Sequence, residues 1–72
     1  MDKRMYVIDG LEFTRKEVID FLMTVIEENE LYDLAELSNT TDRESIKRRV
    51  SNRPLHVAYN IYGQERVTTY TK

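Results

Sequence analysis

The sequence predicts one small domain of the α+β class, and three observations lead to this prediction. The chain has only 72 residues, which is enough for a single hydrophobic core. Apolar residues recur at helical spacing in its first half and alternate at every second position near its C-terminus. It contains no cysteine, so packed aliphatic and aromatic side chains must stabilise the fold.

Residues 1–13 are expected to form a short strand or a hairpin. Asp9-Gly10 stands between two short apolar segments, and this dipeptide readily adopts the positive φ angles of a two-residue turn. The segment carries charges and no long apolar run. We therefore expect neither a signal peptide nor a membrane anchor, and a cytoplasmic location.

A first helix is predicted over residues 14–29. Thr14 and Glu17 have the spacing of a capping box, in which each side chain binds the backbone amide of the other residue. An apolar stripe follows at steps of three and four residues, formed by Val18, Phe21, Leu22, Val25 and Ile26.

A second, short helix is predicted over residues 30–38. Leu31, Leu34 and Ala35 would share one helical face there. The polar run at residues 38–41 is typical of a turn.

A third helix is predicted over residues 41–52, with Thr40 or Thr41 as its cap. Acidic residues in its first turn and basic residues in its last turn match the helix dipole. Ile46 and Val50 are its apolar residues at helical spacing. Most of its surface is therefore expected to face water or a partner.

A β-hairpin is predicted over residues 54–71. Pro54 excludes helical backbone from the residue before it, which ends the third helix. Gly63-Gln64 would form the turn, and both a two-residue and a three-residue loop remain open, so the register is not fixed. On the first strand, one face would carry Leu55, Val57, Tyr59 and Ile61.

Charge is distributed unevenly along the chain. Residues 9–36 contain nine acidic and two basic residues, whereas residues 41–53 contain five basic and two acidic residues. The formal net charge of −2 argues against a sequence-independent coat for nucleic acid, but the basic stretch permits local contact with phosphates. The acidic run at residues 27–30 is interpreted as solvated surface, with a docking patch for a basic protein as the alternative.

The expected order of elements resembles that of a winged helix-turn-helix domain. The segment from Leu34 to Val50 is similar to the pattern in which Leu-Ala of one helix packs against Ile and Val of the next. The hairpin over residues 54–71 would be the wing. In this family the second helix of the motif lies in the major groove of DNA, and the wing contacts the backbone or the minor groove.

The resemblance implies a DNA-binding surface on the third helix and the hairpin tip. Arg43 is the leading candidate for reading guanine, because its planar guanidinium matches the O6 and N7 acceptors. The basic residues later in that helix are expected at phosphates. The candidate DNA-binding residues are Thr41, Arg43, Ser45, Lys47, Arg48, Arg49, Arg53, Gln64 and Arg66.

We therefore expect a small DNA-binding transcription regulator, of the kind that phages or mobile elements encode, which binds duplex DNA as a homodimer. The alternative is a small interaction module that inhibits or recruits a host protein. RNA binding through the tyrosines of the hairpin is a third hypothesis.

Catalysis is not expected, because the sequence has no nucleophile arrangement, Gly-rich phosphate loop or metal-ligand spacing. No cofactor, metal or small-molecule substrate is expected either. His56 is interpreted as an ordinary, partly buried side chain. Tyr59, Tyr62 and Tyr70 are interpreted as cross-strand packing, with a base-stacking platform or a dimer contact as the alternative.

Overall fold

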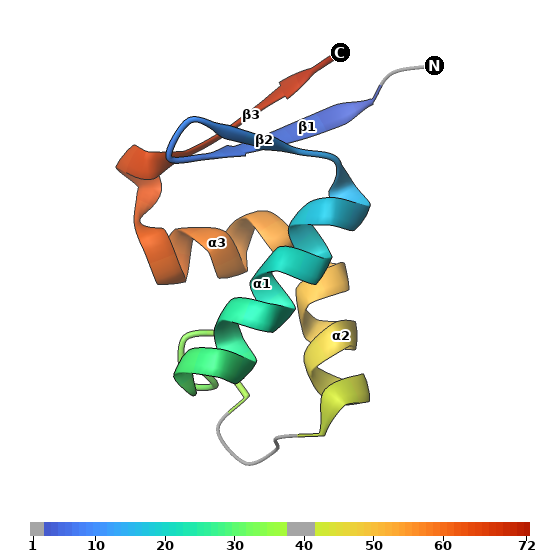
Figure 1. Cartoon of the computed structure of the whole chain (residues 1–72), viewed down its shortest axis with the longest axis vertical. Coiled ribbons are helices and arrows are strands. Elements are labelled where there is room, and N and C mark those ends of the chain that lie inside the picture. Colours follow the sequence, from blue (N-terminus) through green and yellow to red (C-terminus); the bar gives the residue numbers. More distant parts are fainter. Residues whose placement is uncertain (1–2, 38–41) are drawn as a thin grey trace.

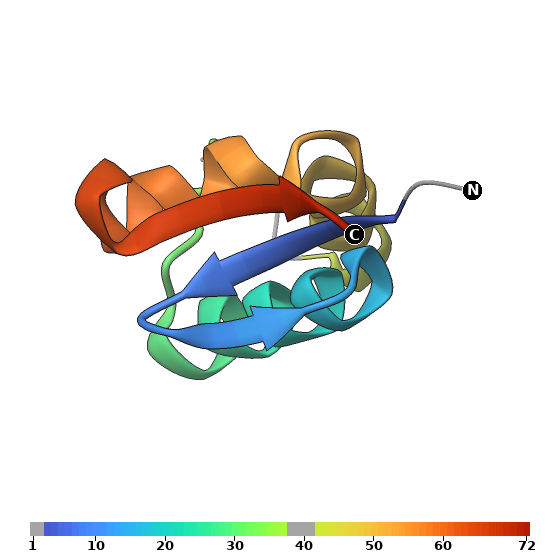
Figure 2. The ribbon, with the colours of Figure 1, turned by 90° about the horizontal axis from the view of Figure 1, so that it is seen from above.

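The computed structural model describes residues 3–37 and 42–72, which form a three-stranded antiparallel sheet and three helices (Figure 1). The strands are β1 (Arg4–Ile8), β2 (Leu11–Phe13) and β3 (Val67–Thr71), in the order β2-β1-β3. Viewed from above, the helices lie beneath the sheet (Figure 2). The α+β class is therefore confirmed, and the combination of elements is consistent with a winged-helix-like arrangement.

The N-terminal hairpin is confirmed. Asp9 and Gly10 connect β1 to β2 with φ angles of 52° and 84°, as the turn chemistry predicts. Tyr6 lies opposite Phe13 in this hairpin, and both contribute to the hydrophobic core.

The first predicted helix is confirmed as α1 (Arg15–Asn29). Its capping box is complete: the Glu17 amide donates to the Thr14 hydroxyl at 3.2 Å, and the Thr14 amide donates to the Glu17 carboxylate at 2.8 Å. Glu30 ends the helix in the left-handed conformation. The buried face of α1 consists of Val18, Leu22, Met23 and Ile26, so Met23 was missed and Phe21 and Val25 are only partly buried.

The second predicted helix is wrong. Within the segment 30–38, residues 32–36 form turns closed by short-range hydrogen bonds, such as the one from the Glu36 amide to the Asp33 carbonyl at 3.0 Å. Glu30 and Glu36 both have left-handed backbone, which interrupts a right-handed helix at each end. The remaining span is too short to offset the cost of helix nucleation. Ala35 is nevertheless fully buried, so the segment contributes to the core without being helical.

The third predicted helix is confirmed as α2 (Arg43–Asn52). Its cap is Asp42, whose carboxylate accepts from the Ser45 amide at 3.2 Å, whereas Thr40 and Thr41 lie outside the described residues. Ile46 and Val50 are fully buried, as their spacing predicts.

The predicted C-terminal hairpin is wrong over its first half, because residues 54–62 form a helix, α3 (Pro54–Tyr62). Proline is well suited to the first turn of a helix, where its missing N–H is not needed. Arg53 has non-helical backbone, as the residue before proline should. Pro54, Val57 and Ala58 are buried at helical spacing, so the alternating pattern conceals a helical stripe.

The last strand therefore has a different partner from the one predicted. Gly63 ends α3 with a φ of 90°, and the 3₁₀ turn η1 (Gln64–Arg66) leads into β3. β3 pairs with β1 along its whole length, from Ile8 opposite Val67 to Arg4 opposite Thr71. The hairpin of this sheet is thus N-terminal, and the C-terminus supplies a single strand.

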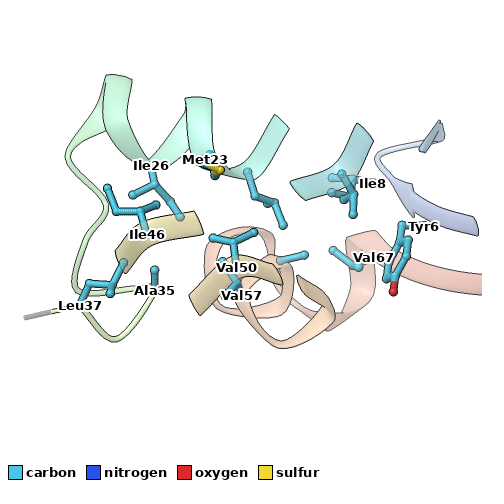
Figure 3. Close-up of a cluster of buried hydrophobic side chains, with 13 residues drawn as sticks. Tyr6, Ile8, Met23, Ile26, Ala35, Leu37, Ile46, Val50, Val57 and Val67 are labelled. Carbon is cyan, nitrogen blue, oxygen red and sulfur yellow. The ribbon is translucent and has the colours of Figure 1, made fainter. Parts of the chain in front are cut away.

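One hydrophobic core joins the helices to the sheet (Figure 3). Its largest fully buried side chains come from α1, α2, α3 and β3, and they include Ile26, Ile46, Val50, Val57 and Val67. No helix in the described part of the chain is long and apolar enough to cross a membrane.

Candidate functional site

α1 and α2 pack in opposite directions, which brings the start of α1 beside the end of α2 (Figure 1). At this end, the Arg15 guanidinium donates to the Ser51 carbonyl. At the other end, Arg43 lies 3.7 Å from the Glu27 carboxylate. The two ends of the helix pair therefore differ in charge, because basic residues begin α1 and acidic residues end it.

Two adjoining grooves lie where α1 begins. One has a volume of about 600 Å³ and runs between the first residues of β1 and the first turn of α1. The other has a volume of about 460 Å³ and runs between α1 and α2. Arg15 and Lys16 line both grooves, while Lys3 and Arg4 line only the first and Lys47 only the second.

Two further grooves continue the basic surface around α2. Arg48 and Arg49 line a groove of about 290 Å³ together with Asn52. Asn52 also lines the neighbouring groove, which contains Arg53 and Tyr6. We call this surface the cationic end and define it by its basic residues, Lys3, Arg4, Arg15, Lys16, Lys47, Arg48, Arg49 and Arg53; the linings of these four grooves also include one acidic residue, Asp20.

Arg15 connects three elements of the fold at the cationic end. Its guanidinium donates to the hydroxyl of Tyr6 on β1 at 3.5 Å as well as to the Ser51 carbonyl on α2. The last carbonyls of a helix have no partner within the helix and carry partial negative charge, so a cation there is favourable. One side chain thus joins the start of α1 to a strand and to a second helix.

The structure brings together four of the sequence-predicted site residues, and a fifth, Ser45, lines the same groove as Arg48 and Arg49. Lys47, Arg48, Arg49 and Arg53 all belong to the cationic end. Arg43 begins α2 at the opposite end, with its side chain 75% exposed beside Glu27. The Ser45 hydroxyl lies 3.2 Å from the Asp42 carboxylate, and Thr41 lies outside the described residues. Acidic groups therefore border the end of α2 that the resemblance assigned to DNA bases.

Gln64 and Arg66 lie in η1, at the far end of α3 from the cationic end (Figure 1). The Arg66 Nε donates to Asp9 Oδ1 at 2.6 Å, and its Nη2 donates to Asp9 Oδ2. Its guanidinium also lies 5.4 Å from the centre of the Tyr62 ring. Arg66 thus joins η1 to the turn between β1 and β2.

The basic residues that sequence reasoning missed are Lys3, Arg4, Arg15 and Lys16. The last two fall within the stretch that looked acidic as a whole. The available signal was their position as the first two residues of a well-capped helix, in which Glu17 is the capping residue and the other acidic residues come later. Their approach to α2 depends on tertiary packing, which the local sequence does not encode.

The Asp9–Arg66 pair predicts a specific dependence of stability on pH. The hydrogen bond from Arg66 lowers the pKa of Asp9 below its ordinary value. A carboxylate with a lowered pKa stabilises the fold fully above its unfolded pKa, about 3.9, and loses this effect as the pH falls through the folded pKa. The thermal stability advantage of the wild type over Asp9→Asn should therefore be full near pH 7 and shrink in acid.

Thermal melts of both proteins between neutral and acidic pH measure this advantage. Arg66→Met removes the other partner and should give the same pH profile as Asp9→Asn. An advantage that grows as the pH falls would contradict the assignment.

Further polar contacts join α3 to the segment of turns before α2. His56 is exposed rather than partly buried, and its Nε2 lies 2.9 Å from the Glu36 carboxylate. Asn60 donates to the Leu34 carbonyl at 3.0 Å, so α3 holds the segment of turns in place. Residues 3–37 and 42–72 contain no cluster of three His, Asp or Glu side chains that could hold a metal ion.

The tyrosines are arranged differently from the predicted cross-strand packing. Tyr59 and Tyr62 lie on α3, and the Tyr62 ring is 6.2 Å from that of Phe21. Of these three tyrosines only Tyr70 is on a strand, where its hydroxyl donates to Glu12. This hydrogen bond raises the pKa of Tyr70. The three rings therefore do not form one platform.

Comparisons of this chain with protein-family models, curated proteins and solved structures find no match.

Proposed function

We propose that this protein binds duplex DNA through the cationic end and acts as a small regulatory protein. The observation that carries the proposal is the gathering of basic side chains from β1, α1 and α2 around the C-terminal half of α2. Lysine and arginine contacts to phosphates supply most of the affinity of such proteins for DNA. A surface that collects these residues from distant parts of the chain suits this purpose.

The C-terminal half of α2 has a suitable shape for the major groove. Successive residues of an α-helix point about 100° apart, so Lys47 and Arg49 point to opposite flanks with Arg48 between them. The major groove is about 12 Å wide, admits an α-helix and has a phosphate wall on each side. In the proposed complex, Lys47 and Arg49 contact opposite walls, and Arg48 and Asn52 lie nearest the base edges.

The acidic residues support one orientation on the duplex. Arg48 replaces Arg43 as the proposed reader of guanine, because Arg43 lies beside Glu27 and near the acidic cap of α2. DNA phosphates would repel the acidic residues at the start of α2 and the end of α1. Lys16 and Arg4, which line the first groove, would contact the backbone beyond the major groove.

A binding titration on two matched variants tests the proposal. Lys47→Gln and Arg43→Gln each remove one exposed positive charge from α2, Arg43 from its first residue beside Glu27 and Lys47 from its middle, one turn closer to the cationic end. Lys47→Gln should weaken binding several-fold and reduce the slope of log K against log salt by roughly 0.9, the value for one phosphate contact. Arg43→Gln should leave both quantities nearly unchanged. Fluorescence anisotropy of a labelled duplex across a salt series measures them, and a larger effect of Arg43→Gln would overturn the proposal.

A second candidate function is a protein-interaction module that binds a basic partner. The observation in its favour is the exposed acidic surface at the end of α1 and in the following turns, which includes Glu28, Glu30 and Asp33. A protein partner that is retained after nuclease treatment, and whose binding is unchanged by Lys47→Gln, would favour this function. Loss of the complex after nuclease treatment, or in the Lys47→Gln variant, would favour DNA binding.

A further inference from the structure

Among the residues that the structure describes, β3 is an edge strand that contains no charged residue and no proline. In the described part of the chain it pairs with β1 on one side only. Its five residues, Val-Thr-Thr-Tyr-Thr, include no charge and no proline. Proteins usually place charges, proline or bulges on exposed edges, because an uncharged edge is a template for another strand. The opposite edge, β2, is only three residues long and carries Glu12 at its centre.

The pairing of β3 with β1 shows which backbone groups point outward. Lys3 and Lys72 exchange both hydrogen bonds, at 3.3 and 2.7 Å. Opposed residues in an antiparallel pair alternate between exchanging two hydrogen bonds and exchanging none. Thr68 and Tyr70 therefore bond to β1, and the residues that direct their N–H and C=O groups away from it are Val67, Thr69 and Thr71.

We propose that two copies of this chain pair through β3 and form a homodimer with a continuous antiparallel sheet. The two-fold axis passes beside Thr69, which faces Thr69 of the second copy. Val67 then faces Thr71 of the second copy. Each facing pair exchanges two backbone hydrogen bonds, so all the outward groups of β3 become satisfied.

The edge is complementary to itself rather than to a charged partner. On one face of the joined sheet Thr69 meets Thr69, and on the other Thr68 meets Tyr70 of the second copy. Threonine and aromatic cross-strand pairs are favourable, and no like charges face each other within β3. A two-fold contact of this kind is complete with two copies. The β2 strands at the two outer edges of the joined sheet are short and carry a charge, which disfavours pairing with further strands.

α3 adds apolar surface to the same interface. It packs beneath β3 in the layer below the sheet (Figure 2). Extending the sheet across the two-fold axis therefore brings α3 of each copy toward the other. Tyr59 and Ile61 of α3 are only partly buried in the single chain, so α3 retains some apolar surface. The proposed dimer does not depend on the proposed DNA binding, because its test measures only the mass of the protein in solution.

The proline variant Thr69→Pro tests the dimer directly. It removes the central outward N–H of β3 without removing a hydrogen bond to β1. Sedimentation across a broad concentration range should give the wild type a mass of twice 8.6 kDa. Thr69→Pro should sediment as a monomer with an unchanged circular dichroism spectrum. Thr69→Val keeps both the N–H and the branched shape, and it should remain dimeric.

A second variant covers the case in which Thr69→Pro fails to fold. Thr69→Lys keeps every backbone group but sets two like charges face to face across the axis, so it should also be monomeric. A wild type that remains a monomer at every concentration would overturn the proposal, as would dimers of the folded Thr69→Pro or Thr69→Lys. A monomer that instead captures an extended peptide at β3 would show that the edge serves a foreign strand.

Discussion

Ile46→Ala should lower the free energy of unfolding by roughly 2–5 kcal/mol, the range for deleting a large aliphatic side chain from a packed core. Ile46 is fully buried and belongs to the cluster that joins α2 to α1 and α3. A domain of this size is expected to have a total stability of only about 4–11 kcal/mol. The variant should therefore be unfolded at much lower urea concentrations, which equilibrium denaturation followed by circular dichroism measures.

Ile19→Ala is the matched control for this change. Ile19 is also an isoleucine in a helix, but it is only partly buried and lines the groove between α1 and α2. It should lose clearly less stability than Ile46→Ala. Equal losses of unfolding free energy in the two variants would show that Ile46 does not lie in the centre of the core.

Reversing two charges of the cationic end should abolish most DNA binding. Lys16 and Lys47 come from different helices and line the same groove, and both are exposed. Losing two charge-assisted contacts at roughly 1.5 kcal/mol each weakens binding on the order of 100-fold, before any repulsion is counted. The double variant Lys16→Glu/Lys47→Glu should therefore show no saturable binding to a duplex that the wild type binds.

The charge-conserving variant Lys16→Arg/Lys47→Arg controls for shape and should keep wild-type affinity within a few-fold. Thermal melts establish that both double variants fold, since neither residue contributes to the core. Retained affinity in the folded Glu variant would exclude this groove from the interface.

Short-range signals in the sequence identified the hairpin, α1 and α2. Asp9-Gly10 can form the tight turn with its own backbone, and Thr14 and Glu17 cap α1 through groups three residues apart. Ile46 and Val50 point to the core because helical geometry alone places them on one face. These features depend on neighbours within one or two turns of the chain.

The features that the sequence did not reveal depend on tertiary contacts. Residues 54–62 have an alternating pattern and branched or aromatic residues that favour a strand, yet Val57 and Ala58 are buried in the helix that packs beneath the sheet. The strand that β3 needed as a partner was β1, at the other end of the chain. The cationic end likewise forms only when the start of α1 meets the end of α2, so the local basic run predicted half of it.

Mapping of amide chemical shifts by NMR during titration with a short DNA duplex tests the central claim most directly. The largest changes should occur at the cationic end, in the first turn of α1 and at residues 47–53. Residues 27–36 and 64–66 should change little. Changes concentrated at residues 27–36 or 64–66, with residues 47–53 unaffected, would contradict the proposed interface.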